Sequence, residues 1–167
     1  RQRQMCIRDS HLAYPTDIVT DIRNYNHFNP KELNPILKLA ICEDNPSHYE
    51  IIHTILQKYP PGAFEITHFT SGDEFLRAAA ENGCPYSIVL TDIDLGSDTV
   101  NGISLAEKIN HISPDTQIIF ISQYLQYATA VYETEHAYFI HKQQMEKYLP
   151  LALRAACQKL QKLHTRY

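Results

Sequence analysis

From residue 37 onward, short apolar runs alternate with stretches in which apolar residues recur every three or four positions. The runs have the length of buried strands, and the periodic stretches have the spacing of helices with one face against a core. The pattern therefore predicts strands at residues 37–42, 63–69, 86–91, 117–121 and 137–140. It predicts helices that begin at Pro46 and at residue 71, and further helices at residues 102–111, 123–134 and 144–164.

Residues with capping and turn chemistry separate these elements. Asn45 is suited to cap a helix whose first turn contains Pro46, and Ser71 with Glu74 three residues later has the spacing of a capping box. Asn82 and Gly83 follow the second periodic stretch, where a helix is expected to end.

Strands that alternate with helices predict right-handed crossovers and a parallel sheet covered on both faces. Five such units over residues 36–160 predict an α/β fold, a flavodoxin-like three-layer sandwich with a five-stranded sheet. Residues 1–35 differ, because the first ten have no apolar period and the rest are polar with several Asn and Pro. We expect this extension to be disordered or not native to the protein.

Composition narrows the possible functions. The 167 residues carry a formal net charge of -4, which argues against a chain that binds nucleic acid along its whole surface. No apolar run is long enough to cross a bilayer, and we expect no membrane association. The four cysteines are far apart and form no CxxC pair, which is typical of reduced thiols in a cytoplasmic protein.

The nine histidines are scattered along the sequence. The close pairs His48/His53 and His136/His141 are five residues apart, a spacing that does not place both rings on one face of a helix. We therefore expect solvated surface histidines and no histidine metal site.

Polar residues follow four of the predicted strands, at the sheet edge where α/β folds bind their ligands. Glu43 and Asp44 follow the first strand, Asp92 the third, Ser122 the fourth and Lys142 the fifth. Clustered carboxylates repel one another unless a cation such as Mg²⁺ neutralises them. Asp92 could then act as a nucleophile toward phosphorus, with Mg²⁺ and the lysine offsetting charge on the phosphoryl oxygens. Ser122 also suits the N-cap of the next helix.

The order ED, DID, NG, S and FIHK along residues 37–160 resembles the receiver domains of two-component response regulators. The resemblance implies a non-enzymatic switch that takes its phosphoryl group from a sensor histidine kinase. It assigns the roles as follows: Asp92 as phosphoacceptor, Asp44 and Glu43 as acids of the Mg²⁺ site together with Asp92, Asp94 as a metal ligand through its backbone carbonyl, Gly102 as the loop glycine, Ser122 and Phe139 as the switch pair, and Lys142 as the lysine of the site.

Residues 122–128 (SQYLQYA) resemble the receivers that precede LytTR-type DNA-binding domains. This implies control of transcription through an output domain absent from the chain, with residues 161–167 starting the linker. DNA would be contacted only by that domain. A homodimer through the face of the fourth strand, fourth helix and fifth strand is a further possibility.

The sequence departs from the family pattern at two points. The loop after Asp92 is longer and lacks the usual proline, and Gln143 replaces the proline that usually follows the lysine. One alternative is a haloacid-dehalogenase-like phosphatase, which Asp92, Asp94 and Ser122 also resemble, although the acidic pair of such enzymes follows the lysine. The other is a receiver-like interaction module that takes no phosphoryl group.

Overall fold

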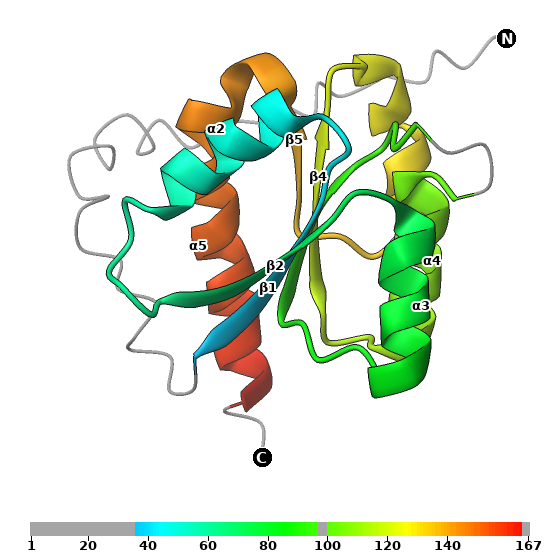
Figure 1. Ribbon diagram of the computed structural model, residues 1–167, viewed down its shortest axis with the longest axis horizontal. Helices are drawn as coiled ribbons and strands as arrows, with labels where there is room; N and C mark the ends of the chain where they lie inside the picture. Colours follow the sequence, from blue (N-terminus) through cyan, green and yellow to red (C-terminus); the bar gives the residue numbers. More distant parts are fainter. Residues whose placement is uncertain (1–35, 97–99, 165–167) are drawn as a thin grey trace, which may run out of the picture.

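The computed structural model describes residues 36–96 and 100–164. Five parallel strands form one sheet in the order β2-β1-β3-β4-β5, as predicted for the flavodoxin-like arrangement. Figure 1 shows α2 and α5 on one face of the sheet and α3 and α4 on the other. The strands are β1 (Leu37–Cys42), β2 (Phe64–Phe69), β3 (Ile88–Asp92), β4 (Gln117–Ser122) and β5 (Tyr138–His141), and the helices are α2 (Pro46–Leu56), α3 (Gly72–Asn82), α4 (Gly102–Ile112) and α5 (Met145–His164).

The expected extension over residues 1–35 lies outside the described residues, as do residues 97–99 of the loop after Asp92. Residues 161–164 of the expected linker continue α5, and residues 165–167 again lie outside the described part. Within the part of the chain that the structure describes, no helix is both long and apolar enough to span a bilayer. Of the four cysteines, Cys42, Cys84 and Cys157 lie within the described residues and are free thiols.

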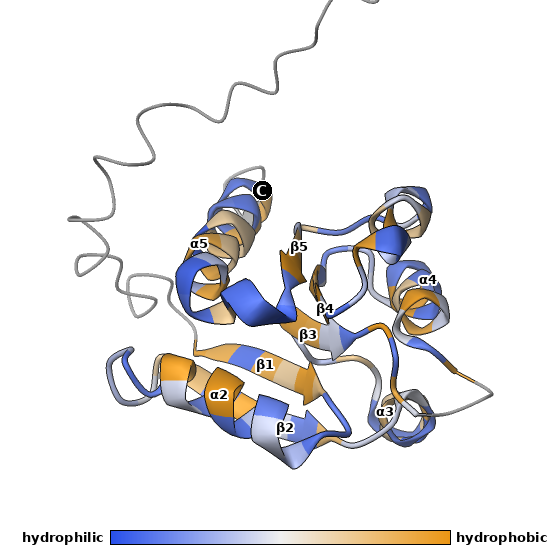
Figure 2. Cartoon of the chain, turned by 90° about the horizontal axis from the view of Figure 1, so that it is seen from above, coloured by the Kyte–Doolittle hydropathy of each residue, from blue (hydrophilic) through white to orange (hydrophobic). Residues whose placement is uncertain are grey.

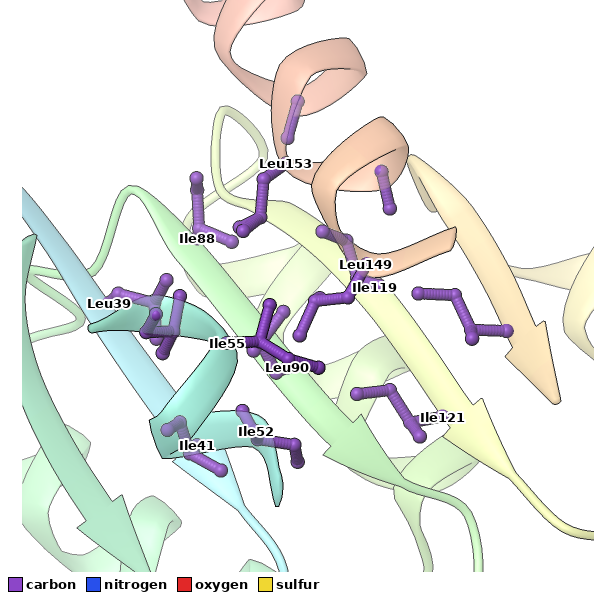
Figure 3. Packing of buried hydrophobic residues seen from close by; sticks show 14 of the residues in the cluster. Leu39, Ile41, Ile52, Ile55, Ile88, Leu90, Ile119, Ile121, Leu149 and Leu153 are labelled. Atoms are coloured by element: carbon purple, nitrogen blue, oxygen red, sulfur yellow. The ribbon is translucent and has the colours of Figure 1, made fainter. Parts of the chain in front are cut away.

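The sheet divides the apolar interior into two cores. Alternate residues of a strand point to opposite faces, so Leu39 and Ile41 pack with α2 and α5, whereas Ala40 and Cys42 pack with α3 and α4. Figure 3 shows the first of these cores, and Figure 2 shows hydrophilic residues on the outer sides of the helices. Because the central strands are buried on both faces, they read as continuous apolar runs in the sequence.

The predicted caps are present. The side chain of Asn45 accepts a hydrogen bond from the Ser47 amide at 2.9 Å, and Ser71 Oγ accepts one from the Glu74 amide at 3.2 Å. Glu74 reaches back to the amide of Thr70, the residue before the cap, at 2.8 Å. These hydrogen bonds fix the first residues of α2 and α3. The Asn45 cap thereby also fixes the end of the β1–α2 loop, which contains Glu43 and Asp44.

The α-helix predicted for residues 123–134 is wrong. The segment instead forms two short 3₁₀ helices, η3 (Leu125–Ala128) and η4 (Ala130–Glu133). Tyr124, Leu125 and Tyr132 are exposed and Val131 is buried, so the apolar residues do not form one stripe against the core. Without such a stripe, a run rich in aromatic and β-branched residues has little to favour an α-helix. The other predicted elements are present, with bounds shifted by up to three residues.

Gly102 begins α4 directly beneath the end of β3. Its amide donates a hydrogen bond to the Ile93 carbonyl at 2.9 Å. A Cβ atom at this position would lie 2.0 Å from the Asp92 carbonyl oxygen, well inside van der Waals contact. The absence of a side chain therefore allows α4 to pack against the backbone that carries Asp92.

We predict that Gly102→Ala lowers the free energy of unfolding by about 3 kcal/mol, because α4 or the end of β3 must move. Urea unfolding followed by circular dichroism measures this change. The control is Gly62→Ala, where φ is +78° and nothing lies within 4 Å, so that only backbone strain of about 1 kcal/mol is expected. An equal or smaller loss for Gly102→Ala would contradict the close packing.

Candidate functional site

Three carboxylates meet at the carboxyl ends of β1 and β3. The two strands pair in register, with Cys42 opposite Thr91, so the residues that follow these positions are brought together. One carboxylate oxygen from each of Glu43, Asp44 and Asp92 lies within 4.8 Å of the other two. Glu43 and Asp92 are only 1% and 5% exposed, whereas Asp44 is exposed. The cluster predicted from the strand ends is therefore present.

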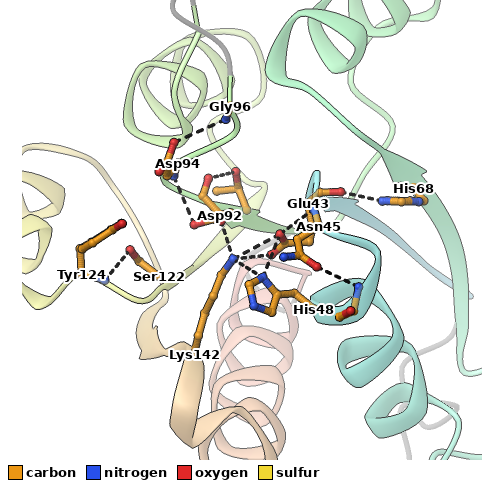
Figure 4. A network of polar contacts seen from close by, with 12 residues as sticks. Glu43, Asn45, His48, His68, Asp92, Asp94, Gly96, Ser122, Tyr124 and Lys142 are labelled. Atoms are coloured by element: carbon orange, nitrogen blue, oxygen red, sulfur yellow. Dashed lines mark hydrogen bonds and ion pairs between the residues drawn. The ribbon is translucent and has the colours of Figure 1, made fainter.

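Lys142, in the short 3₁₀ helix η5 (Lys142–Gln144) after β5, neutralises part of this charge (Figure 4). Its Nζ lies 2.5 Å from Asp92 Oδ2 and 3.2 Å from Glu43 Oε1. The lysine is itself buried, so it is a fixed counter-charge inside the site. Gln143 after the lysine does not prevent this geometry.

Burial and ion pairing act in opposite directions on Asp92. Burial raises the pKa of Asp92, the hydrogen bond and charge of Lys142 lower it, Glu43 raises it, and the net pKa is raised. For Lys142, burial lowers the pKa, but the hydrogen bonds and charges of Asp92 and Glu43 outweigh burial and raise it. The lysine therefore stays protonated at neutral pH.

Glu43 retains an unsatisfied oxygen. Its Oε2 is buried and forms an ion pair with Lys142 Nζ at 2.9 Å, but it accepts no hydrogen bond. Buried carboxylate oxygens normally have a partner. A buried carboxylate oxygen that accepts no hydrogen bond, beside two further carboxylates, fits a hard cation that takes oxygen ligands.

Asp94 lies beside this cluster. Its amide donates to Asp92 Oδ1 at 3.2 Å, and its own carboxylate faces the Gly96 amide at 3.5 Å. The three-acid cluster does not include the Asp94 side chain. Gly96 itself leaves room for Asp44, because a Cβ there would lie 2.8 Å from Asp44 Oδ2. This role of Gly96 depends on its approach to Asp44 and has no local signal in the sequence.

Ser122 and Phe139 lie on the neighbouring strands. Ser122 ends β4 and is buried, and its Oγ accepts a hydrogen bond from the Tyr124 amide at 3.1 Å. Ser122 is not the N-cap of the next helix as predicted, because η3 has Tyr124 at that position and no side-chain cap. Phe139 pairs in register with Phe120 and is half-buried. Ser122 directly follows Ile121, which pairs with Asp92, so its hydroxyl lies at the same edge of the sheet and binds the start of the segment that leads to η3.

His48, expected to be a solvated residue, instead lies in the site. It is the third residue of α2, its side chain is 27% exposed, and its Nδ1 lies 2.7 Å from Lys142 Nζ. His68 contacts the same region from β2, with its Nε2 2.8 Å from the Glu43 carbonyl oxygen. Histidine spacing could not reveal this, because the position of His48 in the site depends on Lys142, 94 residues later in the chain.

Comparisons of the sequence with family models and with curated proteins agree on one family. A family model described as the response regulator receiver domain matches residues 39–154. Accessory gene regulator protein A of Staphylococcus aureus is 32% identical over 111 residues, which are 64% of this chain and 46% of the relative. The response regulator receiver protein CpdR of Brucella abortus is 29% identical over 85 residues, 51% of this chain and 65% of the relative. The chain thus spans about half the length of the staphylococcal relative.

Solved structures agree on the fold. A receiver domain protein from Clostridium thermocellum has a TM-score of 0.63 at 20% identity, covering 76% of this chain and 98% of that one. The N-terminal domain of a three-domain response regulator from Carboxydothermus hydrogenoformans also has a TM-score of 0.63, at 21% identity, covering 77% and 98%. At this identity the likeness establishes the architecture alone.

We predict that Lys142→Met, measured without divalent cations, lowers the free energy of unfolding by about 3–5 kcal/mol, because two buried carboxylates lose their counter-charge. Denaturant unfolding measures the loss, and adding Glu43→Gln should restore part of it. The control is Lys147→Met on the exposed side of α5, where Nζ lies over the Tyr148 ring and a change of about 1 kcal/mol or less is expected. Equal effects at the two lysines would show that the pocket ion pairs contribute little.

Proposed function

The chain belongs to the response regulator receiver domain family, and from this premise we propose that Asp92 accepts a phosphoryl group and that the domain transmits the resulting change. The observation that carries the proposal is the pairing of Asp92 with the buried Lys142 ammonium, 2.5 Å away, within a cluster of three carboxylates. Such a site holds a nucleophile and a counter-charge for the phosphoryl oxygens in one place.

The proposed transfer forms one bond and breaks another. A carboxylate oxygen of Asp92 attacks phosphorus, and the bond from phosphorus to the donor nitrogen of a sensor-kinase phosphohistidine breaks. Lys142 donates hydrogen bonds to oxygens that carry the transferred charge. Glu43, Asp44, Asp92 and the backbone carbonyl of Asp94 would hold Mg²⁺, which supplies further neutralisation when bound.

The hydrogen bond of Ser122 suggests how the signal leaves the site. In the present state Ser122 Oγ accepts from the Tyr124 amide. If the hydroxyl turns to donate to a phosphoryl oxygen, that amide loses its acceptor and the 124–134 segment must rearrange. Phe139 on the adjacent strand would follow into the space. This is a shift between two states of one domain.

The output is proposed from the relatives and the sequence resemblance. The staphylococcal relative is by its name a gene regulator. We propose that this receiver likewise controls transcription in the cytoplasm, through a LytTR-type DNA-binding domain that residues 161–167 lead toward. Its own contacts would be with a sensor histidine kinase and with a second copy through the face formed by β4, η3, η4 and β5, where Leu125 and Tyr132 are 66% and 79% exposed.

The alternatives have less support. In a haloacid-dehalogenase-like phosphatase, Asp94 would act as acid and base beside the aspartyl phosphate. Here the Asp94 carboxylate faces the Gly96 amide, and the acid pair precedes Asp92 in the sequence. A receiver-like module that takes no phosphoryl group would not need the buried Lys142 and its two carboxylate partners. We infer a signalling domain and no enzyme.

Incubation with acetyl phosphate and Mg²⁺ should add the mass of one phosphoryl group to the wild-type chain, and Asp92→Asn should abolish the addition because the amide is not a nucleophile. Intact-mass spectrometry measures both. Asp115→Asn, which changes a residue just before β4, is the control and should be labelled like the wild type.

Labelling of Asp92→Asn would show that another residue is the phosphoacceptor. An unlabelled wild type would favour the interaction module that takes no phosphoryl group. Rapid multiple turnover of p-nitrophenyl phosphate, lost in Asp94→Asn, would favour the phosphatase.

Asp44→Asn should weaken Mg²⁺ binding about tenfold or more, because one charged oxygen ligand is lost from the cluster. Titration calorimetry without a phosphodonor measures the dissociation constant. Glu50→Gln, which removes an exposed acid on α2, is the control with the same change in net charge. Equal effects of the two variants would assign the change to overall charge and remove Asp44 from the metal site.

A further inference from the structure

His48 is a member of the phosphoacceptor pocket that the family resemblance did not assign. α2 begins just after the acids of β1, and its first turn directs the His48 ring toward the end of β5 (Figure 4). The ring lies between Lys142 Nζ, at 2.7 Å from Nδ1, and Glu43 Oε1, at 3.3 Å from the same atom. The ring therefore contacts two charged residues of the site.

The hydrogen-bonding capacity of lysine defines what His48 does there. An ammonium has three N–H donors and no acceptor. The contacts of Lys142 with Asp92, Glu43 and His48 use all three. His48 Nδ1 must therefore carry its lone pair toward Lys142, and the ring proton of the neutral imidazole lies on Nε2. The 3.3 Å contact between His48 Nδ1 and Glu43 Oε1 then joins two acceptors and is not a hydrogen bond.

We infer that His48 is a positioning residue for phosphoryl transfer, which holds the Lys142 ammonium against Asp92 by accepting its third hydrogen bond. The inference rests on the proposed function. A lysine side chain is flexible, and two acids on different strands attract the same ammonium. A third acceptor, fixed on the first turn of α2, selects one position for Nζ.

His48 is also the partner that Lys142 can release most easily. The phosphoryl group brings new oxygens, so one of the three present hydrogen bonds must be exchanged. Glu43 and Asp92 are charged and buried, and losing the lysine would leave a buried charge unpaired. The His48 ring is neutral in this arrangement and 27% exposed, so water can replace the lysine. His48 thus accepts a hydrogen bond from Lys142 before the transfer, and a phosphoryl oxygen takes its place as acceptor afterwards.

The test compares three substitutions in the full chain. In Asn, the side-chain oxygen is the same number of bonds from Cα as Nδ1 of histidine, whereas in Gln it corresponds to Nε2. His48→Leu and His48→Gln should lower the initial rate of labelling by acetyl phosphate with Mg²⁺ by about tenfold, as expected for one lost hydrogen bond to a charged group. His48→Asn should restore the rate to within about twofold. Intact mass measures the rates, and thermal unfolding shows that each variant is folded.

Rates for Leu and Gln that equal the wild type would overturn the inference, as would an Asn variant as slow as Leu. An unlabelled wild type would instead overturn the proposed function, so the two failures differ. A second measurement needs no variant. Nitrogen-15 NMR of the imidazole in the wild type, at alkaline pH, should show the His48 ring protonated on Nε2, and a ring protonated on Nδ1 would contradict the hydrogen bond from Lys142.

Discussion

The ammonium of Lys142 stands between two carboxylates that are almost completely removed from water. Taking each of these charges out of water has a free-energy cost of several kcal/mol, and only close pairing offsets it. Glu43 and Lys142 directly follow β1 and β5, and Asp92 is the last residue of β3, so the pairing requires these three strands to end at the same edge. The register of the parallel sheet and the crossovers place these strand ends together. The two apolar cores hold the strands in that position.

Much of this could be predicted from the sequence, because the relevant rules are local. A buried parallel strand reads as an apolar run, and a side chain that follows it must lie at the carboxyl edge of the sheet. Glu43, Asp44, Asp92, Ser122 and Lys142 were located in this way, and the structure brings the three acids and the lysine together. The caps at Asn45 and Ser71 were predictable for the same reason, since capping chemistry depends on neighbours a few residues apart.

The predictions that were wrong or incomplete concern residues whose structure depends on contacts with residues distant in the sequence. The 123–134 segment has apolar residues at helical spacing, but the sheet and α4 bury only part of them, and two 3₁₀ turns result. His48 has a polar side chain at an ordinary helix position, and only Lys142, 94 residues later, gives it a place in the site. Gly96 and Gly102 are likewise explained by the atoms they approach, the Asp44 carboxylate and the Asp92 carbonyl.

The separation of Lys142 from its partners along the chain also links the site to folding. The lysine is 50 residues from Asp92 and 99 residues from Glu43, and it follows the last strand of the sheet. Contacts between such distant residues carry a larger entropic cost, because a long loop must close to form them. During synthesis the acids leave the ribosome before the lysine that compensates them. A chain whose last strand has not docked therefore lacks the ion pairs of Lys142 with Asp92 and Glu43, and the carboxylate cluster is complete only when the whole sheet has formed.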